Sequence, residues 1–234
     1  YSFLARGLEG ETQPLASIES MAAHYIEDML AEQPEGPYLL GGWSMGGLVA
    51  YEMAQQLKSD HKEVAFLGLF DTPRPVWAHR MVPQKSSTLL KAFALHLGIG
   101  AEIETADEHY ALNEILRHLR AANASASMNE AELANMFRVF STNVKAATSY
   151  KPQEYYGKLS VFAAERTIES GQEPDLGWSA VADSIDTYQS PGDHFSIFTE
   201  PNVSTLAAQL RPLLEEATTS DDQRRQQLSI AASR

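Results

Sequence analysis

Three side chains in this sequence could together carry out nucleophilic catalysis. Ser44, Asp71 and His194 supply a hydroxyl nucleophile, a carboxylate that can orient a base, and an imidazole that can act as that base. They follow one another in the order serine, aspartate, histidine, which is one of the chain orders in which catalytic triads occur. The reaction that such a set performs is acyl transfer through an acyl-serine ester.

The serine lies where a strand is expected to turn sharply into a helix. It belongs to residues 42–47, GWSMGG, which match the pattern GxSxG. The apolar run 37–41 precedes it, and residues 48–57 follow with apolar side chains at helical spacing. The pattern GxSxG alone is weak evidence, because glycine and serine are common residues. An inert serine in a Gly-rich turn is therefore the alternative to a nucleophile.

The sharp turn restricts which residues can stand close to the serine in the sequence. Because Ser44 must adopt a strained backbone conformation, we expect Gly42 and Gly46 to be glycines in order to avoid clashes between strand and helix. The backbone N–H of Met45, at the N-terminus of the expected helix, is the candidate donor to an oxyanion.

Two carboxylates compete to be the orienting acid. Asp71 directly follows the apolar run 64–70, which we expect to be a buried parallel strand, so it lies at the edge of the sheet where ligands gather. Glu165 follows a second such run, 159–164, and is the rival. Asp71 could also be an ordinary turn or helix-capping residue.

Position in the expected fold separates His194 from the six other histidines. It alone follows a late strand, expected at 185–189, through the turn 190–193, and it precedes a final helix that begins near Asn202. A loop histidine on the surface is the alternative. Asp193 is a weaker candidate acid than the two above, because neighbouring residues in a turn seldom point at each other.

These motifs resemble the thioesterase domains that terminate nonribosomal peptide synthetases and mixed peptide-polyketide synthases. The resemblance extends over most of residues 1–215, and it looks closer to the synthetase-embedded type than to the stand-alone editing type. Its marks are GPYLLGGWSMGG at 36–47, VAYEMA at 49–54, the strand ending in Asp71, and PGDHF at 191–195. The resemblance implies that Ser44 is the acylated nucleophile, His194 the general base and Asp71, rather than Glu165, the acid.

One departure from the family concerns the second oxyanion donor. The family begins with a strand and a Gly- or Pro-containing loop that supplies this N–H, whereas residues 1–7 resemble the strand after that loop. The sequence has no initiator Met, so we expect a piece of a longer protein that lacks the second donor. Loss of one such donor costs about 3 to 4 kcal/mol of transition-state stabilisation.

The resemblance also implies a substrate and a partner. A peptidyl or acyl chain would arrive as a thioester on the phosphopantetheine of a carrier protein, upstream in the same polypeptide, and no cofactor would be bound directly. Water would release a free acid, and a nucleophile within the chain would release a macrocycle; both remain open. The alternatives are a stand-alone editing thioesterase or other serine esterase, and a non-catalytic domain that binds acyl chains or carriers.

The composition argues against several other classes of protein. The 234 residues, 44% of them hydrophobic, suit one α/β domain, and a net charge of -13 argues against nucleic-acid binding. The absence of cysteine excludes disulfides and thiolate metal sites, and the histidines lack metal-ligand spacing. No apolar stretch reaches about 20 residues and no signal peptide is visible, so we expect no membrane span and a cytoplasmic location.

We expect the α/β-hydrolase fold, a mostly parallel sheet with flanking helices, over residues 1–217. A helical insertion at about 73–157 interrupts it, and a disordered polar tail occupies 218–234. The tail suits the natural end of a polypeptide.

The insertion is either a layer that covers the sheet or a lid that forms the acyl pocket. As a lid it would be mobile at 125–128, with Trp77 and Tyr150 as candidate pocket walls. Asn129 and Glu132 are spaced to cap its last helix. Apolar periodicity predicts helices at 87–97, 108–121 and 130–150.

Overall fold

The structure is a computed structural model that describes residues 1–75, 86–100, 107–122 and 128–232, with side chains described to residue 219. The chain divides into two compact units. The sheet unit comprises Ile18–Pro75 and Lys151–Arg234, and the helical unit comprises Tyr1–Ser17 and Val76–Tyr150.

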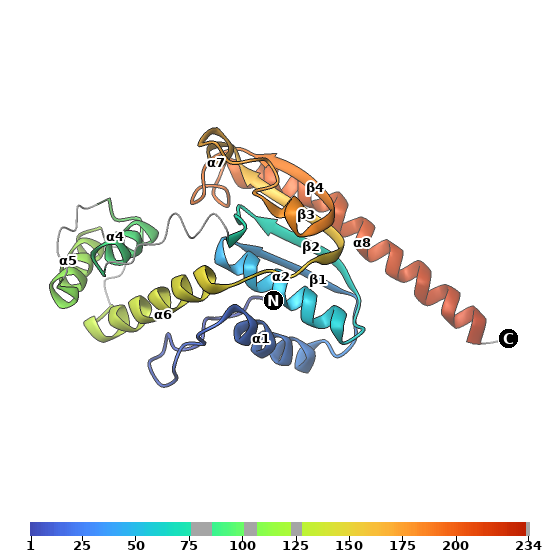
Figure 1. Cartoon of the computed structure of the whole chain (residues 1–234), viewed down its shortest axis with the longest axis horizontal. Coiled ribbons are helices and arrows are strands. Elements are labelled where there is room, and N and C mark those ends of the chain that lie inside the picture. The colour runs from blue at the N-terminus through green and yellow to red at the C-terminus, as the bar shows by residue number, and fades with distance from the viewer. Residues whose placement is uncertain (76–85, 101–106, 123–127, 233–234) are drawn as a thin grey trace. The chain divides into compact units, whose positions relative to one another are not determined.

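Four strands form the sheet, and all three neighbouring pairs are parallel. In spatial order they are β1 (Tyr38–Trp43), β2 (Val64–Phe70), β3 (Tyr155–Ala164) and β4 (Ala182–Ser190) (Figure 1). The sequence of β2, VAFLGLF, is apolar throughout, as expected of a parallel strand covered on both faces. The predicted parallel sheet with flanking helices is confirmed.

Helices flank this sheet. Residues on α2 (Met45–Ser59) pack on β1 and β2, and α1 (Ile18–Glu32) packs on α2. Side chains of α8 (Asn202–Ala232) contact the set of strand residues that includes Phe66, Phe70 and Phe162. Two short helices, α7 (Glu165–Glu169) and η1 (Trp178–Ala180), lie between β3 and β4.

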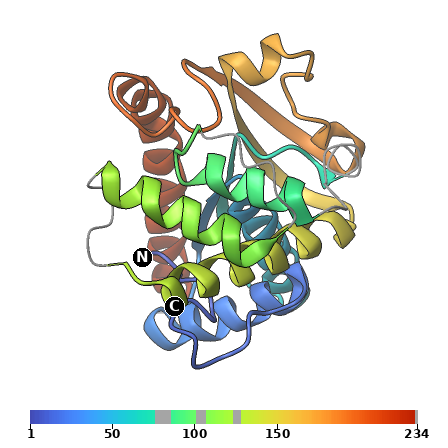
Figure 2. The same ribbon diagram turned by 90° about the vertical axis from the view of Figure 1, so that its left-hand side faces the viewer.

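The helical unit has a core of its own, made by α4 (Ser86–His96), α5 (Glu108–Ala121) and α6 (Glu130–Ser149). These three helices pack against one another (Figure 2). The predicted cap of α6 is confirmed: the Asn129 side chain accepts from the N–H of Glu132, and the Glu132 carboxylate accepts from the N–H of Asn129. The buried residues of this core include Leu90, Phe93, Leu112, Ile115, Leu116, Leu133 and Phe137.

The structure describes residues near both ends of the chain, and the N-terminal part differs from the expectation. Residues 1–17 group with the helices and form no strand. Gly7 and Gly10, with φ of 97° and 83°, make a turn that is closed by the bond from the Gly10 N–H to the Gly7 carbonyl. The backbone of 218–232 continues α8, and the predicted disorder of this tail stays a prediction. The predicted limits of the domain and its insertion stay predictions.

None of the helices within the described ranges has the length and apolar character needed to cross a membrane. Trp77 and most of 125–128 lie outside the described residues. Tyr150, the other candidate pocket wall, follows α6 and is buried.

Candidate active site

The structure brings Ser44, Asp71 and His194 together at the carboxyl ends of the strands. The Nδ1 atom of His194 lies 2.7 Å from Oδ2 of Asp71, and its Nε2 atom lies 3.0 Å from Oγ of Ser44. Because a carboxylate only accepts hydrogen bonds, Nδ1 of a neutral imidazole carries the proton and Nε2 accepts from the serine hydroxyl. This arrangement can remove a proton from Ser44 and direct the imidazole at the same time.

Ser44 occupies the turn between β1 and α2. Its φ of 54° and ψ of -125° are strained for a residue with a side chain. The backbone N–H of Ser44 donates to the carbonyl of Phe70 at 3.0 Å, which ties the turn to β2. The serine hydroxyl makes no capping bond to α2, so it is directed to His194 instead.

The structure requires glycine at other positions around this turn than the sequence predicted, with Gly42 common to both. A Cβ atom on Gly42 would lie 2.0 Å from the carbonyl oxygen of Gly46, so glycine is required at 42 as expected. A Cβ atom on Gly46 would meet nothing within 4 Å, which corrects the expectation for that position. It is Gly47 that has no room, because its Cβ would lie 2.1 Å from Oγ1 of Thr72.

Asp71 is a buried carboxylate, 1% exposed, whose charge is offset by hydrogen bonds. Its Oδ1 accepts from the backbone N–H of Ala164 at 2.8 Å. Its Oδ2 accepts from the Thr167 hydroxyl at 2.9 Å as well as from His194. The sequence analysis missed Ala164 and Thr167, because their contacts with Asp71 span 93 and 96 residues and leave no local pattern.

The two rival carboxylates lie elsewhere. Glu165 begins α7 with an exposed side chain, so Asp71 is the candidate that contacts His194. The Oδ1 atom of Asp193 accepts from the Ser196 hydroxyl and from the N–H groups of Phe195 and Ser196. These bonds, led by the one from the Ser196 hydroxyl, hold the pKa of Asp193 below its ordinary 3.8, and they shape the turn that carries His194.

Met45 is the first residue of α2. The N–H groups in the first turn of a helix have no acceptor within the helix, so the Met45 N–H stays the expected oxyanion donor. Among the residues that the structure describes, no cluster of three His, Asp or Glu side chains could hold a metal ion.

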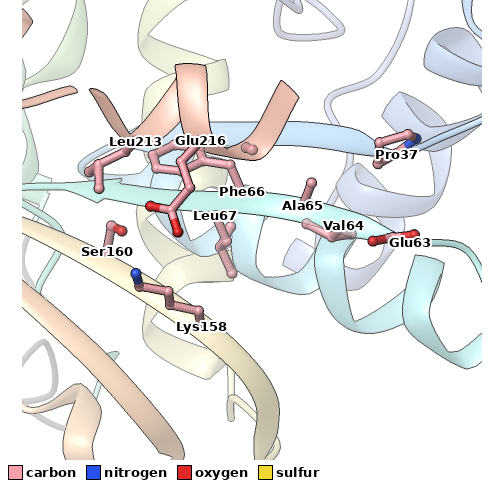
Figure 3. Close-up of a pocket in the computed structure, with 11 residues that line it drawn as sticks. Pro37, Glu63, Val64, Ala65, Phe66, Leu67, Lys158, Ser160, Leu213 and Glu216 are labelled. Atoms are coloured by element: carbon pink, nitrogen blue, oxygen red, sulfur yellow. The ribbon is translucent and has the colours of Figure 1, made fainter. Parts of the chain in front are cut away.

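A separate pocket of about 250 Å³ lies on the side of the sheet where α8 packs (Figure 3). Its walls come from the beginning of β2, from Lys158 and Ser160 on β3, and from Leu213 and Glu216 on α8. Since β2 begins at Val64 and Asp71 follows its other end, this pocket contains none of the three candidate residues.

Comparison with known proteins places this site in a family. A family model described as a thioesterase domain matches residues 1–214, so the chain belongs to the thioesterase domain family. This match and the relatives described next confirm two predictions made from the motifs, the α/β-hydrolase fold and the resemblance to the thioesterase domains of nonribosomal peptide and polyketide synthases.

Several relatives are large synthetases. The chain is 27% identical to enterobactin synthase component F of Escherichia coli (strain K12), over 88% of this chain and 14% of that protein. It is 32% identical to a dimodular nonribosomal peptide synthase of Bacillus subtilis (strain 168), over 69% of this chain and 7% of that protein. A solved four-domain nonribosomal peptide synthetase bound to AMP and glycine is 26% identical with a TM-score of 0.80, over 90% of this chain and 17% of that chain. The chain thus spans only a small part of each.

Proposed function

We propose that this chain releases a peptidyl or acyl chain from the phosphopantetheine thioester of a carrier protein, through an ester on Ser44. The observation that carries the proposal is the pair of distances at His194, 3.0 Å to the Ser44 hydroxyl and 2.7 Å to the Asp71 carboxylate. Membership of the thioesterase family supports the choice of a thioester as the bond that is cleaved.

The first half-reaction would transfer the chain to the enzyme. Nε2 of His194 takes the proton of Ser44 while Oγ attacks the thioester carbonyl, and the N–H of Met45 donates to the oxyanion. The carbon–sulfur bond then breaks, and the pantetheine thiol leaves with the proton from His194. Asp71 holds the imidazole in the required tautomer and stabilises its charged form.

The second half-reaction would release the chain. His194 removes a proton from water or from a hydroxyl or amine of the bound chain, and that nucleophile attacks the ester carbonyl. The carbon–oxygen bond to Ser44 breaks, and Oγ recovers its proton from His194. Water gives a free acid and an internal nucleophile gives a macrocycle.

The partner in this proposal is a carrier protein, in a cytoplasmic biosynthetic assembly. Relatives that are themselves nonribosomal peptide synthetases support this partner. The phosphopantetheine belongs to the carrier, and the domain itself would bind no cofactor.

The test compares the same acyl group on a carrier protein and on a short free thiol. We expect faster release from the carrier, with product identified by mass spectrometry as acid or macrocycle, and no product from Ser44→Ala. Preference for the free thioester would favour a stand-alone editing thioesterase or esterase. Tight carrier binding without any turnover would favour a non-catalytic domain, and both results contradict the proposal.

A further inference from the structure

We propose that Trp43 is a positioning residue that holds His194 at its working distance from Ser44. The inference rests on the proposed roles of Ser44 and His194. Trp43 is the last residue of β1 and directly precedes Ser44. Its indole N–H donates to the backbone carbonyl of His194 at 3.0 Å, across 151 residues of sequence. One side chain thus joins the turn that carries the nucleophile to the loop that carries the base.

The indole ring also packs against aromatic rings of the loop that carries His194. Its centroid lies 5.1 Å from that of the His194 imidazole, with the planes tilted by 34°. The rings of Phe195 and Phe198 meet it edge-on, at 6.4 Å and 6.1 Å. These ring contacts involve His194 itself and two residues that follow it, so Trp43 restrains this part of the loop as well as one carbonyl.

The sheet holds Trp43 in place. Trp43 pairs with Phe70 in the sheet and packs against the core that the sheet forms with α8. The ring of Phe198 packs in turn on Phe70 at 5.6 Å. His194, by contrast, has a side chain that is 32% exposed on a loop. The sheet therefore supplies through Trp43 an anchor for this loop, beyond the hydrogen bonds of Asp193 within it and the bond from His194 to Asp71.

The rate of proton transfer depends on the distance between His194 and Ser44. Proton transfer requires Nε2 of His194 to stay within hydrogen-bond reach of Oγ, and a displacement of about 1 Å can lower a rate by about 100-fold. Loss of the anchor should thus reduce the rate of the chemical step and leave substrate affinity nearly unchanged. A purely structural tryptophan would affect thermal stability alone.

Two replacements of Trp43 separate the contribution of its hydrogen bond to kcat from the contribution of its ring. Benzothienylalanine in place of Trp43 keeps the shape of the side chain and substitutes sulfur for the N–H, whereas Trp43→Phe also shortens the ring system. We expect kcat for a p-nitrophenyl ester to fall about tenfold in the first and further in the second, with KM changed less than twofold. Unchanged kcat in both would overturn the inference.

The matched control is Tyr51→Phe in the same unit. It removes a hydroxyl that donates to the carbonyls of Gln153 at 2.7 Å and Val181 at 3.2 Å, away from Ser44 and His194. This variant should lose stability but keep its kcat, measured well below its unfolding temperature. An equal loss of kcat in the control would show that destabilisation alone slows the enzyme and would overturn the assignment.

A double-mutant cycle shows whether Trp43 acts through His194. In a His194→Ala background, Trp43→Phe should change the residual rate of ester cleavage less than twofold, because the group that it positions is gone. The same loss with and without His194 would contradict the inference. The two proposals can fail separately. The proposed function fails if release from the carrier is no faster than release from the free thiol, whereas the inference about Trp43 fails if kcat for the p-nitrophenyl ester is unchanged in both replacements of Trp43.

Discussion

At the scale of single residues, the site depends on how Asp71 is held. Its carboxylate is buried, and a buried polar group needs hydrogen-bond partners. Three donors compensate it, from Ala164, Thr167 and His194, and two of them meet at the same oxygen. The orientation of the imidazole is therefore set by a carboxylate that is itself fixed on two sides.

The first prediction separates the two candidate acids. Asp71→Asn should lower the rate of Ser44 acylation by about 10⁴-fold, because an amide at this position favours the wrong imidazole tautomer. Glu165→Gln, an exposed neighbour of the site, serves as the control and should stay within twofold of wild type. Burst kinetics with an activated ester measure both rates, and the reverse ranking would reassign the acid to Glu165.

The second prediction concerns pH and Asp193. Since hydrogen bonds lower the pKa of Asp193 in the folded state, the carboxylate stabilises the fold above its ordinary pKa of 3.8, and this contribution is lost as the pH falls through the lowered folded value. The difference in unfolding free energy between wild type and Asp193→Asn should thus be larger at pH 6 than at pH 3. The effect should be small, because the Asp193 side chain is 42% exposed. Urea unfolding at the two pH values measures it, and a difference that grows toward pH 3 contradicts it.

At the scale of elements, the turn from β1 to α2 brings the helix close to the end of β1 and to the Thr72 side chain. Gly42 faces the carbonyl of Gly46, while Gly47 faces Thr72, which follows the end of β2. The strained φ of Ser44 is sustained by these approaches and by its bond to Phe70. Helix α2 can therefore start directly after the nucleophile.

The third prediction compares alanine at the three glycines. Gly42→Ala and Gly47→Ala should destabilise the protein by about 3 kcal/mol or more, because each new methyl group would overlap fixed atoms. Gly46→Ala is the matched control, and it should stay within about 1 kcal/mol of wild type, since it meets open space and gains helix propensity. Urea unfolding measures the free energy of unfolding of each variant. Equal losses of stability in Gly46→Ala and Gly47→Ala would contradict the geometry of the turn.

At the scale of the whole molecule, each of the two units has its own apolar core. The core on the α8 side of the sheet receives its helix side chains from Leu206, Leu210, Leu213, Leu214 and Ala217. The described contacts of α8 with the sheet therefore end near residue 217. The remainder of the helix is polar in sequence, with DDQRRQQ at 221–227.

The fourth prediction concerns the contribution of residues 220–234 to stability. A protein that stops at Thr219 should unfold within about 4 °C of the full chain, because the core contacts described for α8 are retained. Leu206→Ala, which removes a buried α8 side chain, should cost about 2 to 5 kcal/mol and is the comparison. Calorimetry measures both, and a large loss on truncation would show that residues 220–234 support the fold.

Much of the architecture could be predicted because its signals are local. The limits of β2 and α5 match the expected ranges, since β2 is an unbroken apolar run and α5 has its buried residues at helical spacing. The first residues of β4 were missed, because Asp183 and Ser184 are exposed on an edge strand that carries no apolar pattern. The three candidate residues came from motif and chain order.

What supports those residues could not be predicted in the same way. The contacts of Gly47 with Thr72, of Thr167 with Asp71 and of Trp43 with His194 join residues far apart in the sequence. Each depends on how neighbouring strands bring their loops together, and no spacing within a motif records that.

The most direct test of the account is intact-mass spectrometry after treatment with a fluorophosphonate, followed by peptide mapping. We predict a single adduct on Ser44, formed by attack of Oγ on phosphorus with loss of fluoride, and slow labelling in His194→Ala. The Ser44→Ala protein, with its fold verified by circular dichroism, should remain unlabelled. An adduct that persists in Ser44→Ala, or maps to another residue in the wild type, would place the nucleophile elsewhere and contradict the account.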